Sequence, residues 1–327
     1  MKIVELDYNK ENTVTRANKL FFVFCTLFLI SRLAFTLYIN FQIELYGLDV
    51  ANNMFDDYTY PLILYNEIVL VLLPALIYTL IYRLNIPYGF RFNTLKFKNL
   101  IIILLLSVPL YVFLSSVNSI SYYFLQHVGD IPARDLPLPK NAREFILSLF
   151  IVAFIPAVCE EYFLRGILLN AYNRRGAFSA IISGGIFFSI FHFDLTNILA
   201  PFFFGVIIGY VVLRTNSIYA GILAHFLNNA IAHTMMFVAS KPDAPAIVRI
   251  SPDEFFGILL QCLVSLAVIF LLLMAIKALN PQVKLKKTIR NPFLGFFDII
   301  THRPVLLSLV LYGLRTYFIL IRVQFIK

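Results

Sequence analysis

Charge is scarce in this sequence, and cysteine is scarcer still. Only 14% of its 327 residues are charged and 60% are hydrophobic, whereas a soluble domain carries roughly 25% charged residues. The shortage of charge excludes a soluble globular enzyme, and the abundance of apolar residues excludes a disordered chain. The cysteines, Cys25, Cys159 and Cys262, lie apart inside apolar runs and form no CxxC pair. The sequence therefore predicts neither a disulfide framework nor a cysteine-based metal site.

Long apolar runs dominate what is present, and the mean hydropathy is +0.82. A membrane-spanning helix needs about 20 apolar residues, whereas a membrane β-barrel shows alternating segments of about 10 residues. Runs of spanning length occupy about residues 20–40, 61–82, 99–125, 144–172, 177–193, 197–213, 217–238 and 255–276. The sequence therefore predicts an all-α protein, a polytopic transmembrane helical bundle with about eight spans.

The distribution of basic residues predicts the orientation of these spans. With the N-terminus in the cytoplasm, 17 of the 27 lysines and arginines fall in inside segments and five fall outside, as the positive-inside rule requires. Both termini are then cytoplasmic. Since cytoplasmic loops account for the net charge of +9, no nucleic-acid partner is expected.

Three regions follow from this topology. We expect a cytoplasmic N-terminal segment over residues 1–19, a transmembrane domain over 20–280 and a basic cytoplasmic tail over 281–327. The tail contains one more apolar run, 304–323, which two arginines interrupt. We predict an interfacial or packed helix there, with a ninth span as the alternative.

Ionisable groups inside the apolar runs mark the candidate site, because each costs about 2.5–3.5 kcal/mol to insert. In the fourth run, Glu161 and Arg165 are four residues apart, on one helix face and within reach of an ion pair. Glu160 projects about 100° away and is left free for chemistry. One structural and one chemical carboxylate are typical of a site that separates two titratable groups. A plain packing salt bridge, with Glu160 near the aqueous interface, is the alternative.

Imidazole and amide groups lie at a similar depth. His192 ends the fifth run, and His225 and Asn229 share one face of the seventh. Counted at about 1.5 Å per residue from the cytoplasmic boundary, Glu160, His192 and His225 lie about 18, 22 and 12 Å deep. Together these groups predict a hydrolytic centre. In it, Glu160 activates water as a general base, and the histidine and asparagine side chains bind a metal or an oxyanion.

Other polar or small residues in the runs have simpler interpretations. His233 is interpreted as a separate packing or pore-lining residue. Glu67, beside Asn66, is interpreted as part of a buried hydrogen-bonded pair, with a place at a substrate entrance as the alternative. Gly205 and Gly209 form a GxxxG pair in the sixth run, which favours close helix packing beside the site.

The order of the polar residues resembles that of a known family. The matching motifs are Glu160-Glu161-x-x-x-Arg165, Phe188-x-x-x-His192 and His225-x-x-x-Asn229. They are similar to the motifs of the CPBP family, which groups CaaX prenyl endopeptidases with bacterial bacteriocin-processing and self-immunity proteins, also called the Abi family. The resemblance covers about residues 145–235. It implies an intramembrane endopeptidase in which Glu160 activates the attacking water and Glu161 and Arg165 support it.

The resemblance leaves the cofactor open, because family members are described both as metalloproteases and as glutamate proteases. The groups that it implies as metal ligands or oxyanion donors are Glu160, His192, His225 and Asn229. The sequence has no HExxH motif, and these side chains are a thin ligand set for Zn²⁺ or another divalent metal. Protease classes that need an intramembrane aspartate pair or a GxSxG serine are not indicated either.

The expected substrate is a hydrophobic, prenylated or leader peptide that is presented by the lipid bilayer. The sequence contains no Trp and is rich in Ile, Phe, Asn and Lys, which favours a bacterial source. That source in turn favours the plasma membrane and peptide precursors. Two other functions are compatible with the pattern. One is a non-catalytic bacteriocin self-immunity or scaffold protein, and the other is a proton-coupled transporter with a Glu/His relay. The oligomeric state is not indicated.

Overall fold

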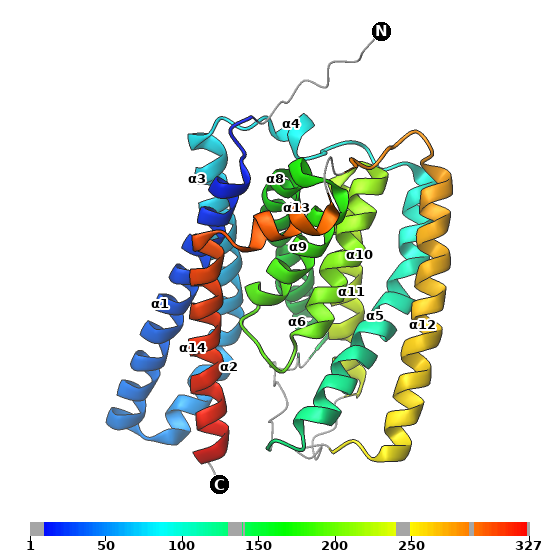
Figure 1. The fold of residues 1–327 in the computed structure, drawn as a ribbon. Coiled ribbons are helices and arrows are strands. Elements are labelled where there is room, and N and C mark those ends of the chain that lie inside the picture. Colours follow the sequence, from blue (N-terminus) through cyan, green and yellow to red (C-terminus); the bar gives the residue numbers. More distant parts are fainter. Residues whose placement is uncertain (1–9, 130–138, 140, 240–248, 288–290, 326–327) are drawn as a thin grey trace.

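A computed structural model describes residues 10–129, 139, 141–239, 249–287 and 291–325. All regular elements in these ranges are helices, as the sequence predicts, and they form one bundle (Figure 1). The first half contains α1 (Val14–Tyr46), α2 (Leu48–Tyr65), the π-helical η1 (Asn66–Leu72), α3 (Leu73–Ile81), α4 (Ile86–Gly89), α5 (Phe97–Leu125), α6 (Ala142–Leu149), the π-helical η2 (Phe150–Phe154) and α7 (Ile155–Glu161). The second half contains the π-helical η3 (Tyr162–Leu168), α8 (Leu169–Tyr172), the 3₁₀-helical η4 (Asn173–Arg175), α9 (Ala177–Phe191), α10 (Leu199–Thr215), α11 (Ile218–Ala239), α12 (Pro252–Leu279), α13 (Pro292–Ile300) and α14 (Arg303–Phe325).

By length and composition, fewer helices qualify as membrane spans than the eight predicted. Among the described residues the candidates are Val14–Tyr46, Asp57–Ile81, Phe97–Leu125, Ala142–Arg175 and Pro252–Leu279. The pair α13 and α14, bent by 67°, makes a sixth if it is one span. The apolar helices α9 and α10 have only 15 and 17 residues. At about 1.5 Å per residue, they are shorter than a hydrocarbon core of about 30 Å.

The short helices α9 and α10 form a hairpin that turns inside the bundle. Its connection, residues 192–198, lies short of the far end that α1 and α12 reach (Figure 1). The connection is polar: Asp194 Oδ1 accepts hydrogen bonds from the backbone N–H of Thr196 at 2.9 Å and from its hydroxyl at 2.7 Å. These bonds satisfy local polar groups at a depth where backbone groups otherwise need a helix.

The predicted inside segments gather at one end of the bundle, where α1 begins. The connections around α4, between η4 and α9, and before α13 all lie at this end (Figure 1). However, α14 packs along α1 and runs in the same direction, so it ends at the opposite end (Figure 1). Residues 304–323 therefore pack along α1 from one end of the bundle to the other, which fits the alternative of a further span. The end of α14 lies opposite the start of α1, which differs from the expectation that both termini lie on one side. Residues 1–9, 288–290 and 326–327 of the predicted terminal segments lie outside the described residues.

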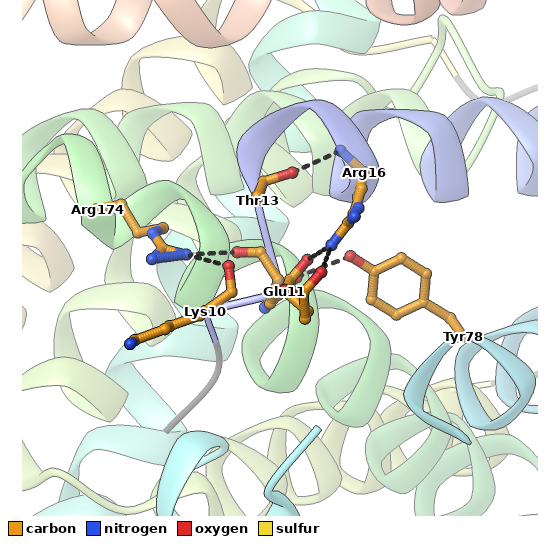
Figure 2. A network of polar contacts seen from close by, with 7 residues as sticks. Lys10, Glu11, Thr13, Arg16, Tyr78 and Arg174 are labelled. Atoms are coloured by element: carbon orange, nitrogen blue, oxygen red, sulfur yellow. Dashed lines mark hydrogen bonds and ion pairs between the residues drawn. The ribbon is translucent and has the colours of Figure 1, made fainter. Parts of the chain in front are cut away.

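A polar network fixes the start of α1 against the helix that carries the candidate acids. Thr13 is the N-cap, and its hydroxyl accepts a hydrogen bond from the backbone N–H of Arg16 at 3.3 Å. The side chain of Arg16 is paired with Glu11, and Arg174 in η4 donates to the carbonyl of Lys10 at 3.1 Å (Figure 2). The cap satisfies a helix-terminal N–H group, and Arg174 joins the N-terminal segment to the end of the fourth predicted span.

The close helix crossing of α9 and α10 depends on glycine. A Cβ atom on Gly205 would lie 2.7 Å from the Cα of Gly185. A Cβ atom on Gly185 would lie 2.8 Å from the carbonyl oxygen of Phe202. Gly209, the second glycine of the predicted GxxxG pair, is looser, because its Cβ would meet nothing nearer than 3.7 Å. The close approach therefore uses Gly205 with Gly185 rather than Gly205 with Gly209.

We expect Gly205→Ala to lower the stability of the protein by about 1–3 kcal/mol, because the added methyl group overpacks the α9–α10 contact. The matched control is Gly209→Ala, which adds the same methyl group at ordinary van der Waals distance. Thermal unfolding of the detergent-solubilised variants measures the difference. Equal melting temperatures for the two variants would show that the crossing does not depend on Gly205.

Candidate active site

A buried ion pair lies at the centre of the site. Glu161 and Arg165 have 0% and 3% of their surface exposed, and Arg165 Nη1 donates to Glu161 Oε1 at 2.6 Å. Their spacing of four residues along α7 and η3 places them on one face, as the sequence indicates. An unpaired charge in this environment would be costly, so each side chain neutralises the other.

His225 on α11 completes this pair. Its Nδ1 lies 3.0 Å from Glu161 Oε1. Since a carboxylate oxygen only accepts, Nδ1 carries the hydrogen and Nε2 keeps its lone pair. That Nε2 lies 3.9 Å from Glu160 Oε2, which is longer than a direct hydrogen bond. Glu161 thus orients the imidazole, while Glu160 faces its other nitrogen.

Aromatic rings cover the ion pair. The guanidinium of Arg165 lies 4.8 Å from the ring centroid of Phe188 and 5.9 Å from that of Phe204. The His225 ring contacts the same two rings edge to face, with centroids 5.8 and 4.9 Å away. The cation–π attraction replaces part of the lost hydration of Arg165. It also gives Phe188, the first residue of the Phe188-x-x-x-His192 motif, a physical role.

The predicted site residues divide into two groups. Glu160, His192, His225 and Asn229 line a cavity of about 300 Å³. Glu161 and Arg165 are not on its wall and lie behind His225. The structure therefore gathers the four groups that the sequence proposes for chemistry.

His192 is held at the end of α9 by its own helix and by the C-terminal region. Its Nδ1 lies 2.8 Å from the carbonyl oxygen of Phe188, which leaves Nε2 as the acceptor nitrogen. The next residue, Phe193, has a left-handed backbone conformation with φ of 48°. The carbonyl of Phe193 accepts a hydrogen bond from Arg315 Nε on α14 at 3.0 Å. One of the arginines that interrupt the last apolar run thus stabilises the turn that follows His192.

Sequence reasoning missed several groups at the site. The carboxyl group of Glu67, from η1, is buried and is within hydrogen-bonding reach of the Glu160 carboxyl; the sequence had suggested a pair with Asn66. Asn197 and Asn228 also line the cavity. The sequence feature that could have identified these three residues is an acid or amide side chain inside an apolar run. His233 is a packing residue, since its Nε2 lies 2.8 Å from Ser148 Oγ.

The predicted ligand set does not form a metal site as it is arranged. The tautomers would suit a metal, because both site histidines leave Nε2 as an acceptor. However, among the described residues no group of three or more His, Cys, Asp and Glu side chains lies close enough to hold one ion. Glu160 and His225 supply two donors, which is fewer than the three protein ligands of a catalytic zinc site.

The fold and the site together define a polytopic helical membrane protein with a buried carboxylate–imidazole centre. Residues 142–231 match the family model described as type II CAAX prenyl endopeptidase Rce1-like, so this part of the chain is an Rce1-like domain. The domain contains all six predicted site residues and confirms the resemblance to the CPBP family. It is the domain of a CAAX-type membrane protease family. The comparisons with curated proteins and with solved structures find no match.

We expect Arg165→Met to lower the stability by about 3–5 kcal/mol, because it leaves the buried Glu161 carboxylate uncompensated. The double variant Glu161→Gln/Arg165→Met should recover part of this loss, since it removes both charges. Arg16→Met is the matched control, because its ion pair with Glu11 is partly solvent-exposed and worth about 0–1 kcal/mol. Thermal unfolding measures all three. A double variant less stable than Arg165→Met would contradict this account of the pair.

Proposed function

We propose that the protein is an intramembrane endopeptidase that hydrolyses a peptide bond in a membrane-associated or hydrophobic peptide. The observation that supports this most is the placement of Glu160 and His225 Nε2, 3.9 Å apart, on the wall of one cavity. The Rce1-like domain supports the protease class. The composition, without Trp and rich in Ile, Phe, Asn and Lys, favours peptide precursors in the plasma membrane of a bacterium as substrates.

The proposed chemistry starts with a water molecule between Glu160 and His225. Both facing atoms are acceptors, so the water donates one hydrogen to each and turns a lone pair towards the substrate carbonyl carbon. As the new C–O bond forms, Glu160 takes one proton from the water as general base. Asn229 Nδ2 stabilises the developing oxyanion, since Asn229 Oδ1 is directed to Asn228 Nδ2 at 3.4 Å.

Collapse of the tetrahedral intermediate completes the reaction. The C–N bond breaks, and the proton held by Glu160 passes to the leaving nitrogen, so that the products are a carboxylic acid and an amine. Glu161 and Arg165 take no proton in this scheme. Their role is to keep the Nδ1 hydrogen of His225 in place, which keeps Nε2 available to the water.

We expect Glu160→Gln to reduce cleavage by at least about a hundredfold, because the amide cannot accept the proton from water. The assay follows cleavage of an internally quenched CAAX-type peptide in proteoliposomes, with melting temperature as the folding control. Glu44→Gln is the matched control, since Glu44 is exposed on α1. Full activity of a folded Glu160→Gln variant would favour the non-catalytic immunity or scaffold alternative.

We also expect cleavage to persist in the presence of EDTA and 1,10-phenanthroline, because the described side chains do not converge on one ion. The rate before and after dialysis against each chelator is the measurement. Loss of activity that added Zn²⁺ restores would mean that the ligand groups rearrange around a metal. That result would contradict the proposal that Glu160 activates water without a metal.

A further inference from the structure

Away from the cavity, the buried asparagines Asn99 and Asn280 have partners for their amide groups, whereas Asn173 Oδ1 in η4 has none among the described residues. On α5 and after α12, Asn99 and Asn280 exchange hydrogen bonds: Asn99 Nδ2 donates to Asn280 Oδ1 at 3.1 Å, and Asn280 Nδ2 donates to Asn99 Oδ1 at 2.9 Å. Such pairing avoids the cost of about 1–3 kcal/mol that an unpartnered buried polar group carries. This reciprocal pair is the reference for the asparagines of the cavity.

Two asparagines on the cavity wall differ from this pattern. The Oδ1 atoms of Asn197 and Asn228 are buried and have no hydrogen-bond partner among the described residues. Asn228 Nδ2 faces Asn229 Oδ1 at 3.4 Å, which leaves the Asn228 oxygen as the group with no donor. Both residues line the same cavity as Glu160 and His225.

The two acceptors come from different elements and share one cavity with the reacting groups. Asn197 belongs to the turn between α9 and α10, whereas Asn228 lies on α11. A ligand that satisfies both must carry more than one hydrogen-bond donor. An extended peptide does so, since every non-proline residue has one main-chain N–H. A hydrocarbon or isoprenoid chain has no such donor, so these amides are not suited to a lipid.

We propose that Asn197 and Asn228 bind the main chain of the substrate, with each Oδ1 accepting a hydrogen bond from a peptide N–H near the scissile bond. This inference rests on the proposed endopeptidase function. The two residues are substrate-binding groups rather than groups that move protons. They hold the peptide by its backbone, so this contact does not select for a side chain.

A second cavity gives the peptide a path away from the site. It has a volume of about 580 Å³, lies between α5 and α12, and shares Asn118 with the first cavity. Its wall carries polar groups, among them Ser119 and Gln261. These two helices pack against each other and diverge toward the end where α12 begins (Figure 1). A substrate longer than the first cavity therefore continues past Asn118.

The test removes hydrogen-bond donors from the peptide one at a time. The probes are an internally quenched farnesyl-cysteine CAAX peptide and an unlipidated hydrophobic peptide, both in proteoliposomes. Whichever peptide the wild type cleaves is resynthesised with one N-methyl group at each main-chain nitrogen near the cleavage point. We expect KM to rise about tenfold at two of these positions, the effect of one lost hydrogen bond each, with little change in kcat.

Variants then assign each position to a residue. Asn197→Leu and Asn228→Leu should each raise KM about tenfold for the unmodified peptide and abolish the effect of one N-methyl group. Asn228→Asp, which keeps the acceptor oxygen, should retain that effect. The melting temperatures of both leucine variants should fall less than that of Asn99→Leu, since each removes an unpartnered oxygen and Asn228→Leu breaks a single contact of 3.4 Å with Asn229. Asn99→Leu is the matched control: it breaks a reciprocal pair, lowers the melting temperature and leaves KM unchanged.

The outcomes separate this inference from the function on which it rests. If the wild type cleaves neither probe, the endopeptidase function fails, and the inference fails with it. If the wild type cleaves a probe but the leucine variants keep its KM and its pattern of N-methyl sensitivity, only the role of Asn197 and Asn228 is overturned.

Discussion

The structure depends on one shared carboxylate oxygen, Glu161 Oε1, which accepts from Arg165 at 2.6 Å and from His225 at 3.0 Å. In an apolar bundle these groups are tolerable only if they are paired, because breaking such a pair costs several kcal/mol. The helix α11 packs closely against this carboxylate. A Cβ atom on Gly221 would lie 2.6 Å from the other oxygen of Glu161, so α11 approaches the carboxylate through a glycine. The pair therefore fixes both the position of α11 and the tautomer of His225.

The helix packing around the pair also helps to compensate the buried charges of Glu161 and Arg165. The glycine contact between α9 and α10 brings Phe188 and Phe204 together, and both rings lie over Arg165. Because α9 ends inside the bundle, His192 reaches the cavity wall instead of the far end. Arg315 then stabilises the turn beyond it through the carbonyl of Phe193. The last helix thus supports the Rce1-like domain, although it lies outside residues 142–231.

The sequence predicted what depends on local spacing. The Glu161–Arg165 pair follows from the helical repeat, and the all-helical class follows from the apolar runs. It could not predict contacts between elements that are distant in the chain, such as Glu67 against Glu160 or α14 along α1. The predicted number of spans differs from the number of candidate spans in the structure for a related reason. The sequence shows that residues 177–193 and 197–213 are apolar, but not that the polar turn between them stays within the bundle.

The different surroundings of Glu160 and Glu161 bear on the alternative of a proton-coupled transporter. A relay needs groups that exchange protons freely, whereas Glu161 is fully buried and bound to a permanent cation. The hydrogen bond of Arg165 goes to Glu161, whereas the neighbours of Glu160 are His225 Nε2 and the carboxyl group of Glu67. A carboxyl group that faces a cavity and an acceptor nitrogen is suited to take a proton from water and return it to a product. The arrangement thus favours one local proton transfer over transport through the bundle.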